Sequence, residues 1–388
     1  MIGFRRVARR PMSRPIRALD GLGLAGIIVA AALASAPVSL TAQQARTAIP
    51  DKEFWRLVTE LSEPGGVFPP QLMSNEDSAQ FVIPELKDAV RPGGVYIGVG
   101  PEQNFTYLAA LSSRLAFVVD IRRDNMLELL MYKALFELSA DRAEFVSRLF
   151  SRARPSGLNG ASTITALFDA YRTATPDAAL FERNVRAVLD GLTRTHGFPL
   201  NEADQIAITK MMAAFRTAGP NALEGYGDGM KLTYAQLMAA TDLEGREHGF
   251  LSSEARFELV RTLERQNLIV PVVGDFGGGT ALAGIARYLK ERNAVVDTFY
   301  VSNVERYLWE QGDHGKQFYA NVAALPLDGS STFIRSITSD ISLRLGIPIP
   351  SGPARWRTFL FPIRDCLARI ADGRIQTYRD LFGTVRQR

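Results

Sequence analysis

The 388-residue sequence has few of the residues that most often bind metals or cross-link chains: one cysteine, Cys366, and three widely separated histidines. A single cysteine excludes a disulfide framework and a cysteine-based zinc site. No two histidines have the i, i+4 spacing that places metal ligands on one helix face, so no metal site is expected. The motifs Gly-Lys-Ser/Thr and Gly-x-Ser-x-Gly are absent as well. Their absence argues against nucleotide hydrolysis at a P-loop and against serine hydrolysis at a nucleophile elbow.

Net charge is small outside the N-terminal segment. Residues 1–42 contain six arginines and one aspartate, a net charge of +5, whereas the whole chain has a formal charge of +4. Residues 43–388 are therefore nearly neutral, and the sequence indicates no nucleic-acid partner. The composition, 46% hydrophobic and 22% charged, is that of a globular protein. The length predicts two domains, or one large domain with an insertion.

A long apolar run occurs in the N-terminal segment, where residues 22–40 carry no charge. A basic stretch followed by such a run is typical of a secretory signal or an N-terminal membrane anchor. The small residues 34–36 resemble a cleavage site, although Pro37 follows them directly. Three interpretations stay open: a cleaved signal peptide, a retained anchor, or a chain that starts at Met12. Residues 1–42 thus predict an exported protein, periplasmic or extracellular, whose membrane contact is limited to this segment.

The sequence contains two predicted βαβ units. In the first, strands over 95–99 and 115–120 flank a glycine turn and a helix. In the second, strands over 268–273 and 295–301 flank a helix over 280–291. Such apolar runs, separated by helices, are typical of parallel strands covered on both faces. They predict an α/β protein with a doubly wound, mostly parallel sheet.

The spacing of apolar residues between the two units is helical. We expect a large helical insertion over 126–266, which separates the first half of the core, 43–125, from the second half and the C-terminal tail, 267–388. In the second half, the pattern predicts a helix over 303–318 and a strand over 322–327. Because the insertion leaves and rejoins the sheet at one edge, we expect it to cover the cleft beside the first glycine turn.

Glycine and polar residues gather where the predicted strands end. Gly98 and Gly100 supply a tight turn at which a ligand can approach backbone N–H groups, although an ordinary strand-to-helix turn is the alternative. Asp120 follows Gly98 by 22 residues, close to the spacing at which an acid holds a ribose diol, although it can also cap the next helix. Asp275 precedes three glycines that form a predicted anion-binding nest, and Asn303 follows the next strand. Carboxyl ends of parallel strands share one edge of a sheet, so a small-molecule site is expected there.

Glu102 gives an indication of the ligand's charge. A pyrophosphate at the first glycine turn meets this carboxylate within the first helical turn, where like charges repel. A ligand with an ammonium or sulfonium group tolerates the carboxylate. The sequence therefore favours a ligand of the S-adenosylmethionine type over NAD.

The stretch Val95-Tyr96-Ile97-Gly98-Val99-Gly100, with acids at the ends of two later strands, resembles the S-adenosylmethionine-dependent methyltransferase superfamily. The resemblance implies a Rossmann-type core in which Gly98 and Gly100 line the methionine moiety and Asp120 binds the ribose. The chain departs from the superfamily pattern because it lacks the acid before the glycines and has Gln103 at the third glycine position.

A closer similarity covers most of 53–340. The segments 62–66, 98–107, 120–123 and 299–305 resemble a family of uncharacterised bacterial proteins with the same kind of core. That similarity implies no particular activity.

Two functions follow from these features. In the first, the protein binds S-adenosylmethionine through Gly98, Gly100, Glu102, Asp120 and Asp275 and transfers the methyl group to an unknown acceptor. The candidates for positioning that acceptor are Asn104, Tyr107, Asp275 and Asn303. In the second, an exported protein on the same core binds a ligand or partner without catalysis. Export favours the second function, because S-adenosylmethionine is a cytosolic metabolite.

Overall fold

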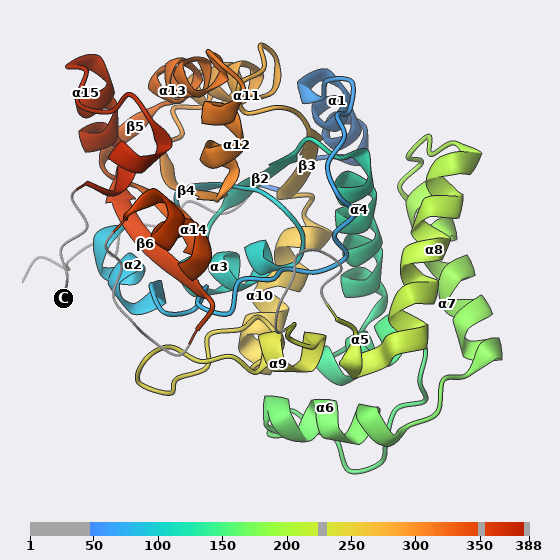
Figure 1. Ribbon diagram of the computed structural model, residues 1–388. Coiled ribbons are helices and arrows are strands. Elements are labelled where there is room, and N and C mark those ends of the chain that lie inside the picture. The colour runs from blue at the N-terminus through green and yellow to red at the C-terminus, as the bar shows by residue number, and fades with distance from the viewer. Residues whose placement is uncertain (1–46, 224–230, 348–353, 384–388) are drawn as a thin grey trace, which may run out of the picture. The chain divides into compact units, whose positions relative to one another are not determined.

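The computed structural model describes residues 47–223, 231–347 and 354–383, and within them six strands form one sheet (Figure 1). The strands are β1 (Val95–Gly98), β2 (Leu115–Asp120), β3 (Ile269–Val273), β4 (Val296–Ser302), β5 (Leu327–Thr338) and β6 (Trp356–Pro362). Their order is β3-β2-β1-β4-β5-β6; β1 to β5 are parallel, and β6 is antiparallel to β5. The order reverses between β1 and β4. This α/β sheet is compatible with a Rossmann-like layout.

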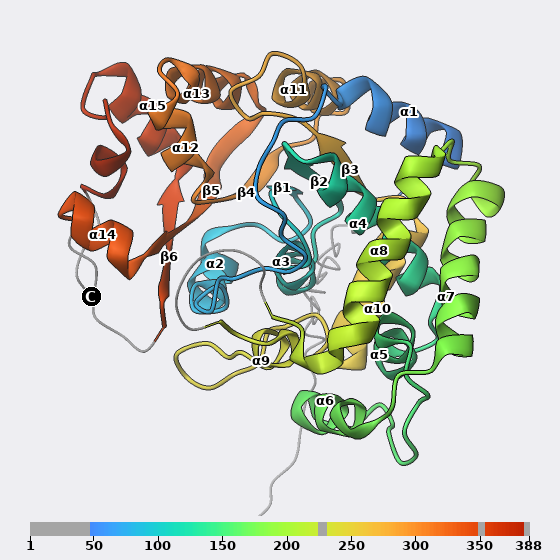
Figure 2. The same ribbon diagram turned by 45° about the vertical axis from the view of Figure 1, so that its right-hand side comes forward.

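Helices cover both faces of the sheet (Figures 1 and 2). One layer consists of α1 (Asp51–Leu61), α11 (Ala281–Glu291), α13 (His314–Ala324) and α15 (Ile363–Ala371). The other consists of α2 (Ile83–Ala89), α3 (Gln103–Leu111), α4 (Arg123–Leu138) and α10 (Glu254–Arg265). Because both faces are covered, β1 is buried along its whole length and so is β3, as their unbroken apolar sequences predict.

Further helices between β2 and β3 pack against α4 or against one another (Figure 2). They are α5 (Arg142–Phe150), α6 (Ile164–Thr173), α7 (Ala178–Asp190), α8 (Glu202–Ala218) and α9 (Tyr234–Met238). Aromatic rings join these helices to the core: the ring centroids of Phe136 on α4 and Phe145 on α5 are 4.6 Å apart. Buried aromatic area of this kind fixes the helices against one another.

The structure corrects two predictions in the second half of the core. The predicted strand over 322–327 is wrong, because α13 extends to Ala324 and β5 begins at Leu327. Phe318 and Val322, four residues apart, lie on the buried side of that helix, and a short apolar run alone does not distinguish such a helix end from a strand. The predicted helix over 303–318 is two helices, α12 (Val304–Glu310) and α13, separated at Gly312, which has a φ of +67°.

Within the described residues no helix has both the length and the hydropathy needed to cross a membrane. The apolar run of residues 22–40 and the rest of the predicted leader, 1–42, lie outside those residues.

Candidate functional site

A cavity of about 860 Å³ lies where the parallel strands end. Its walls include Gly100 after β1, Asp120 at the end of β2, Asp275 after β3, and Asn303 after β4. The strand order reverses between β1 and β4, and ligands of open α/β sheets bind at this switch point. The volume is within the range of small-molecule sites. The structure therefore brings together four of the residues singled out in the sequence.

The cavity is covered by the chain segment before β1 and by the helices that follow β4 and β5. The lining residues come from segment 67–76, from α12, and from α14 (Ser339–Leu345). Among the described residues, none between Arg122 and Gly274 lines the cavity. For the described part of the insertion, the expectation that it covers the cleft is therefore wrong. Within the insertion, α4 and α10 cover the sheet, and α5 packs against them through Phe145, which contacts Phe136 of α4 and Phe257 of α10.

Segment 62–76 is fastened along the carboxyl edge of the sheet by hydrogen bonds. The N–H of Glu63 donates to the carbonyl of Val273 at 2.8 Å, and the N–H of Gly66 donates to the carbonyl of Ile121 at 2.8 Å. The carbonyl of Gln71 accepts from Arg122 at 3.1 Å. These bonds hold the segment over the ends of β2 and β3, where it forms part of the cavity wall.

The first glycine turn is held from inside by Asn104. The side-chain amide of Asn104 donates to the carbonyls of Val99, Gly100 and Pro101 at 3.0, 3.0 and 2.7 Å. Its Oδ1 accepts from the hydroxyl of Tyr96 at 2.9 Å. Asn104 is buried and does not line the cavity. Its place in the structure is that of a positioning residue for the turn, not that of a group in contact with a ligand.

The two glycines of the turn have different physical roles. A Cβ at Gly98 would lie 2.0 Å from Oδ1 of Asn104, so glycine is required there by the close approach of Asn104. Gly100 has a φ of +77°, and a Cβ there would meet open space. Gly100 lines the cavity, whereas Gly98 lies behind it.

Asp120 forms a buried ion pair with Arg122. Its Oδ1 accepts from the backbone N–H and Nε of Arg122 at 2.9 and 3.0 Å, and its Oδ2 accepts from Nη2 at 2.9 Å. Both side chains line the cavity. The neighbouring Arg123 instead pairs with Asp204 of α8 at 2.8 Å. Oδ2 of Asp120 accepts one hydrogen bond from Arg122 and can accept a second, because a carboxylate oxygen has two acceptor positions.

Glu102 is fully buried and is not a wall residue of the cavity. Both of its oxygens lie 3.0 Å from the backbone nitrogen of Ser74. Burial raises the pKa of Glu102 to about 7, so a large fraction of this carboxyl is protonated at neutral pH. The argument that a charged Glu102 selects against pyrophosphate is therefore not supported by its position.

The glycine nest before α11 contains a carboxylate of the chain itself. Oε1 of Glu63 accepts from the N–H groups of Thr280 and Ala281, each at 2.9 Å. A Cβ at Gly278 would lie 2.5 Å from Oε2 of Glu63, so glycine is needed there for the carboxylate to enter. The nest binds an anion, as its sequence predicts, but that anion is Glu63.

The other predicted residues divide into wall and interior positions. Asp275 lines the cavity, and its Oδ1 accepts from the N–H of Gly277 at 2.8 Å. Asn303 also lines it. Tyr107 is buried away from it, and its hydroxyl donates to the carbonyl of Ala79 at 3.0 Å.

Glu76 and Ser302 are wall residues that the sequence analysis did not single out. The hydroxyls of Ser302 and Ser336 donate to the two oxygens of Glu76. Burial raises the pKa of this carboxyl. Ser302 has a φ of +51°, a conformation that costs about 1–2 kcal/mol for a residue with a Cβ. The polar residues 74–76 could have suggested a binding segment. Their contact with Ser302 could not be predicted, because the two segments lie far apart in the sequence.

A family described as a domain of unknown function (DUF7790) matches residues 72–385. The chain belongs to this family. The DUF7790 match includes every strand of the sheet and the walls from Ser74 to Trp356. No curated protein matches the chain significantly. Among the described residues of this DUF7790 protein, no cluster of three or more His, Cys, Asp or Glu side chains could hold a metal ion.

Proposed function

We propose that this protein binds an adenosyl-type ligand, S-adenosylmethionine, in the 860 Å³ cavity and transfers its methyl group to a small-molecule acceptor. One observation carries the proposal: the cavity at the switch point joins Gly100, Asp120, Asp275 and Asn303, which come from four different strand ends. The resemblance of the sequence to the methyltransferase superfamily supports the same ligand.

The wall residues are suited to an adenosyl ligand in two respects. Oδ2 of Asp120 retains acceptor capacity for a ribose hydroxyl while Arg122 holds the carboxylate in place. Asp275 is a wall residue whose carboxylate forms no ion pair with an arginine among the described residues, and it complements the positive charge of a sulfonium, whereas Asp120 is already paired with Arg122 and four arginines line the same cavity. When bound, S-adenosylmethionine supplies an electrophilic methyl group. Gly100 and Asp120 would hold it, and Asp275 and Asn303 would orient the acceptor.

The second candidate function is ligand binding without catalysis. It is favoured by the position of Asn104 and Tyr107, two of the four candidate catalytic residues, whose polar atoms are engaged in internal hydrogen bonds. The glycine nest is likewise occupied by Glu63. A binding protein needs the cavity but does not need a group that removes a proton from an acceptor.

The test is isothermal titration of the full chain with S-adenosylmethionine, S-adenosylhomocysteine, adenosine and NAD. Replacing Asp120 is a poor probe, because it leaves the buried guanidinium of Arg122 unpaired. Gly100→Asn is better, since asparagine tolerates the left-handed conformation and its side chain enters the cavity. The matched control is Gly157→Asn, with a φ of +85°, open space around its Cβ and no place in the cavity wall.

The expected result is that the wild type and Gly157→Asn bind both S-adenosyl compounds, whereas Gly100→Asn binds them about 10-fold or more weakly. If the wild type binds neither at millimolar concentration, the proposal fails. If it binds them and forms no S-adenosylhomocysteine with any acceptor mixture, binding without catalysis takes its place.

A further inference from the structure

A second cavity adjoins the first at its outer end. It has a volume of about 550 Å³ and is bounded by α12, α14 and residues 376–379. Arg306, Ile341 and Arg344 are wall residues of both cavities. The second cavity, here called the outer groove, therefore extends the site away from Gly100 and Asp120 rather than forming a separate one.

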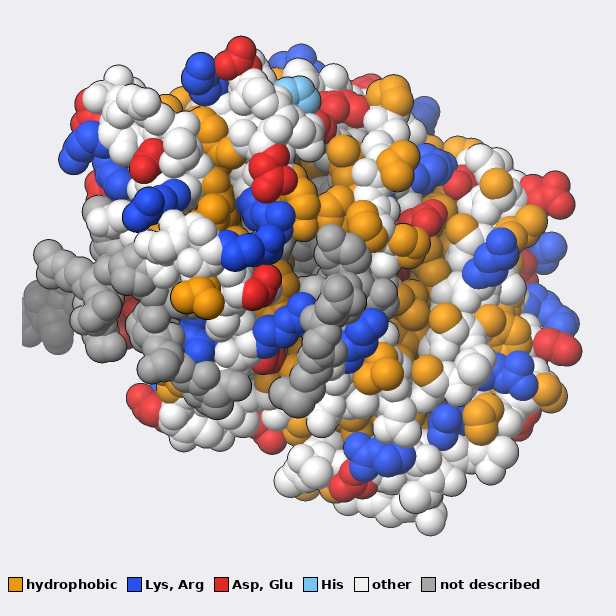
Figure 3. Space-filling view, viewed as in Figure 1, with side chains coloured by type: hydrophobic (Ala, Val, Ile, Leu, Met, Phe, Trp, Pro, Cys, Tyr) orange, Lys and Arg blue, Asp and Glu red, His pale blue; other side chains and the backbone are white. Residues whose placement is uncertain are grey.

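The outer groove is rich in arginine. Arg306, Arg344 and Arg379 line it, against one lining carboxylate, that of Glu310. Asp340, which pairs with Arg344, lies in the wall of the first cavity. Figure 3 shows basic side chains gathered on the face that carries α12 and α14, with acidic side chains among them.

The ion pairs of these arginines are weak enough for a ligand to compete with them. Nη2 of Arg344 lies 3.4 Å from Asp340, and both side chains are about two-thirds exposed, at 64% and 66%. Nε of Arg306, whose side chain is 26% exposed, lies 3.1 Å from Glu310, whose side chain is 57% exposed. Exposed pairs of this kind contribute about 0–1 kcal/mol, so the guanidinium groups remain available to an anion. Arg379 is exposed, and its charge acts on the neighbouring Asp380, whose pKa it helps to lower.

A tryptophan of the groove supplies a fluorescent reporter. Trp309 is a wall residue of the groove, and its indole Nε1 is buried, so that nitrogen does not face a ligand in the groove. The three guanidinium groups of Arg306, Arg344 and Arg379 favour a ligand rich in acceptor oxygens.

We propose that the outer groove binds the carboxylate or phosphate group of a small anionic molecule, and that this anion is the methyl acceptor. The second statement rests on the proposed function, and the first does not. An acceptor held through its charged group in the outer groove extends toward the first cavity, past the shared residues Arg306 and Arg344. The guanidinium fork recognises both oxyanions, so the arms of the test distinguish carboxylate from phosphate.

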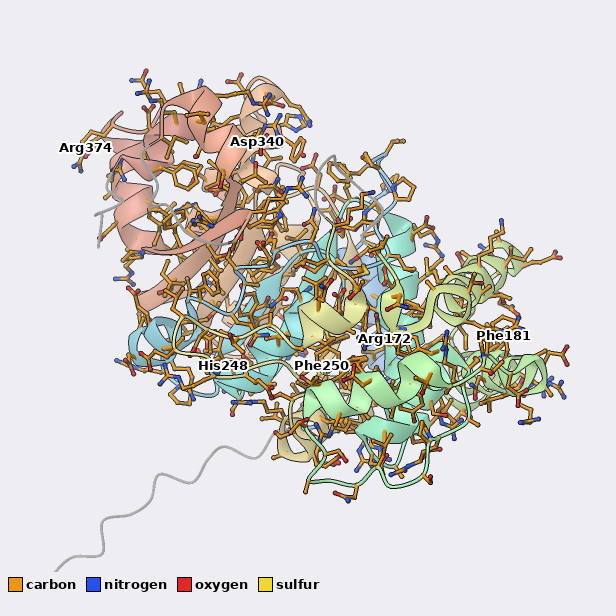
Figure 4. All side chains as sticks on the ribbon, turned by 60° about the horizontal axis from the view of Figure 1, so that its bottom comes forward. Arg172, Phe181, His248, Phe250, Asp340 and Arg374 are labelled. Carbon is orange, nitrogen blue, oxygen red and sulfur yellow. The ribbon has the colours of Figure 1, made fainter. Side chains whose placement is uncertain are left out.

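The test titrates the full chain with pyrophosphate and, separately, with citrate, by calorimetry and by tryptophan fluorescence. The variant is Arg306→Gln with Arg344→Gln. The control is Arg374→Gln, because Arg374 also pairs with an exposed neighbouring carboxylate, Asp372, but lines neither cavity. Figure 4 shows Arg374 well apart from Asp340.

The expected result is that at least one anion binds the wild type and that the double variant binds it about 10-fold or more weakly, with a smaller dependence on salt. Arg374→Gln binds as the wild type does. Trp309→Phe retains the calorimetric signal and loses most of the fluorescence change.

Three results would overturn the inference: no binding of either anion at millimolar concentration, equal weakening by the control, or a fluorescence change that persists in Trp309→Phe. The two proposals fail separately. Anion binding without S-adenosylmethionine binding refutes the proposed function alone, and the reverse refutes the outer groove alone.

Discussion

Glu102 offers a sharp test of how burial controls charge beside the glycine turn. Its carboxyl is fully buried, and its pKa rises from 4.5 to about 7. The folded protein therefore retains a proton that the unfolded chain releases above pH 4.5. The contribution of Glu102 to stability consequently falls as pH rises from 4.5 to about 7 and changes no further above that pH. At 1.36 kcal/mol for each pH unit of that window, the loss is about 3 kcal/mol.

The perturbation is Glu102→Gln, which keeps an oxygen to accept from the N–H of Ser74 and removes the titration. Other buried carboxyls titrate in the same range, since burial also raises the pKa of Glu264 to about 8 and that of Asp297 to about 7. The useful quantity is therefore the difference in free energy of unfolding between variant and wild type. The free energy of unfolding of the variant minus that of the wild type should be about 3 kcal/mol more positive at pH 8 than at pH 4.5.

Urea unfolding at pH 4.5, 6 and 8 measures this difference. Glu85→Gln is the control, because it makes the same chemical change at an exposed position of α2. Its difference from the wild type should stay nearly constant with pH. A constant difference for Glu102→Gln as well would show that this carboxyl titrates normally, and the interpretation of a largely uncharged glycine turn would be abandoned.

Two further predictions concern contacts that fasten the edges of the fold. Glu63→Ala should lower the free energy of unfolding by about 1 kcal/mol, because it removes the carboxylate from the N-terminus of α11. The control Glu60→Ala breaks only the exposed ion pair with Arg56 and should change the urea midpoint little. Equal effects of the two variants would contradict the capping role of Glu63. His196 contacts Asp51 and Glu137 at 2.8 and 2.7 Å, and its hydrogen bond to Glu137 raises its pKa above 6.5. The stability that protonated His196 contributes is therefore complete below pH 6.5 and declines as pH rises through the folded-state pKa. In urea unfolding, the difference in free energy of unfolding between the wild type and His196→Gln should shrink toward pH 9. A difference that grows with pH would contradict a raised pKa of His196.

The central strands could be predicted from the sequence because burial on both faces leaves a simple pattern. The predicted strand over 115–120 is β2 without change, and the one over 268–273 differs from β3 by a single residue. β5 was missed because polar residues interrupt it. Arg335 in its middle is fully buried, and its Nε lies 2.5 Å from Oε2 of Glu305. Because a charged residue in a strand usually indicates solvent exposure, a buried ion pair gives a core strand the sequence pattern of an exposed one.

The candidate site was predictable in its location but not in the orientation of its side chains. Strand ends can be read from the sequence, so Asp120 and Asp275 were expected at one edge, where the structure has them. Asn104 and Glu102 both belong to the polar start of α3, and no local pattern shows that their side chains turn inward. Those orientations are fixed by contacts with Tyr96 and Ser74. Such contacts depend on tertiary packing, which spacing along the chain does not record.

The hydrogen bonds of segment 62–78 have a consequence for the order in which the molecule assembles. Glu63 contacts Ala281, 218 residues later, Glu76 contacts Ser336 after 260 residues, and Ser78 contacts Thr358 after 280. During synthesis, this early segment must wait until nearly the whole chain has been made before its partners exist. Closing such long loops is entropically unfavourable and slows folding. On the ribosome, the walls of the cavity can therefore close only after β5 and β6 have been made.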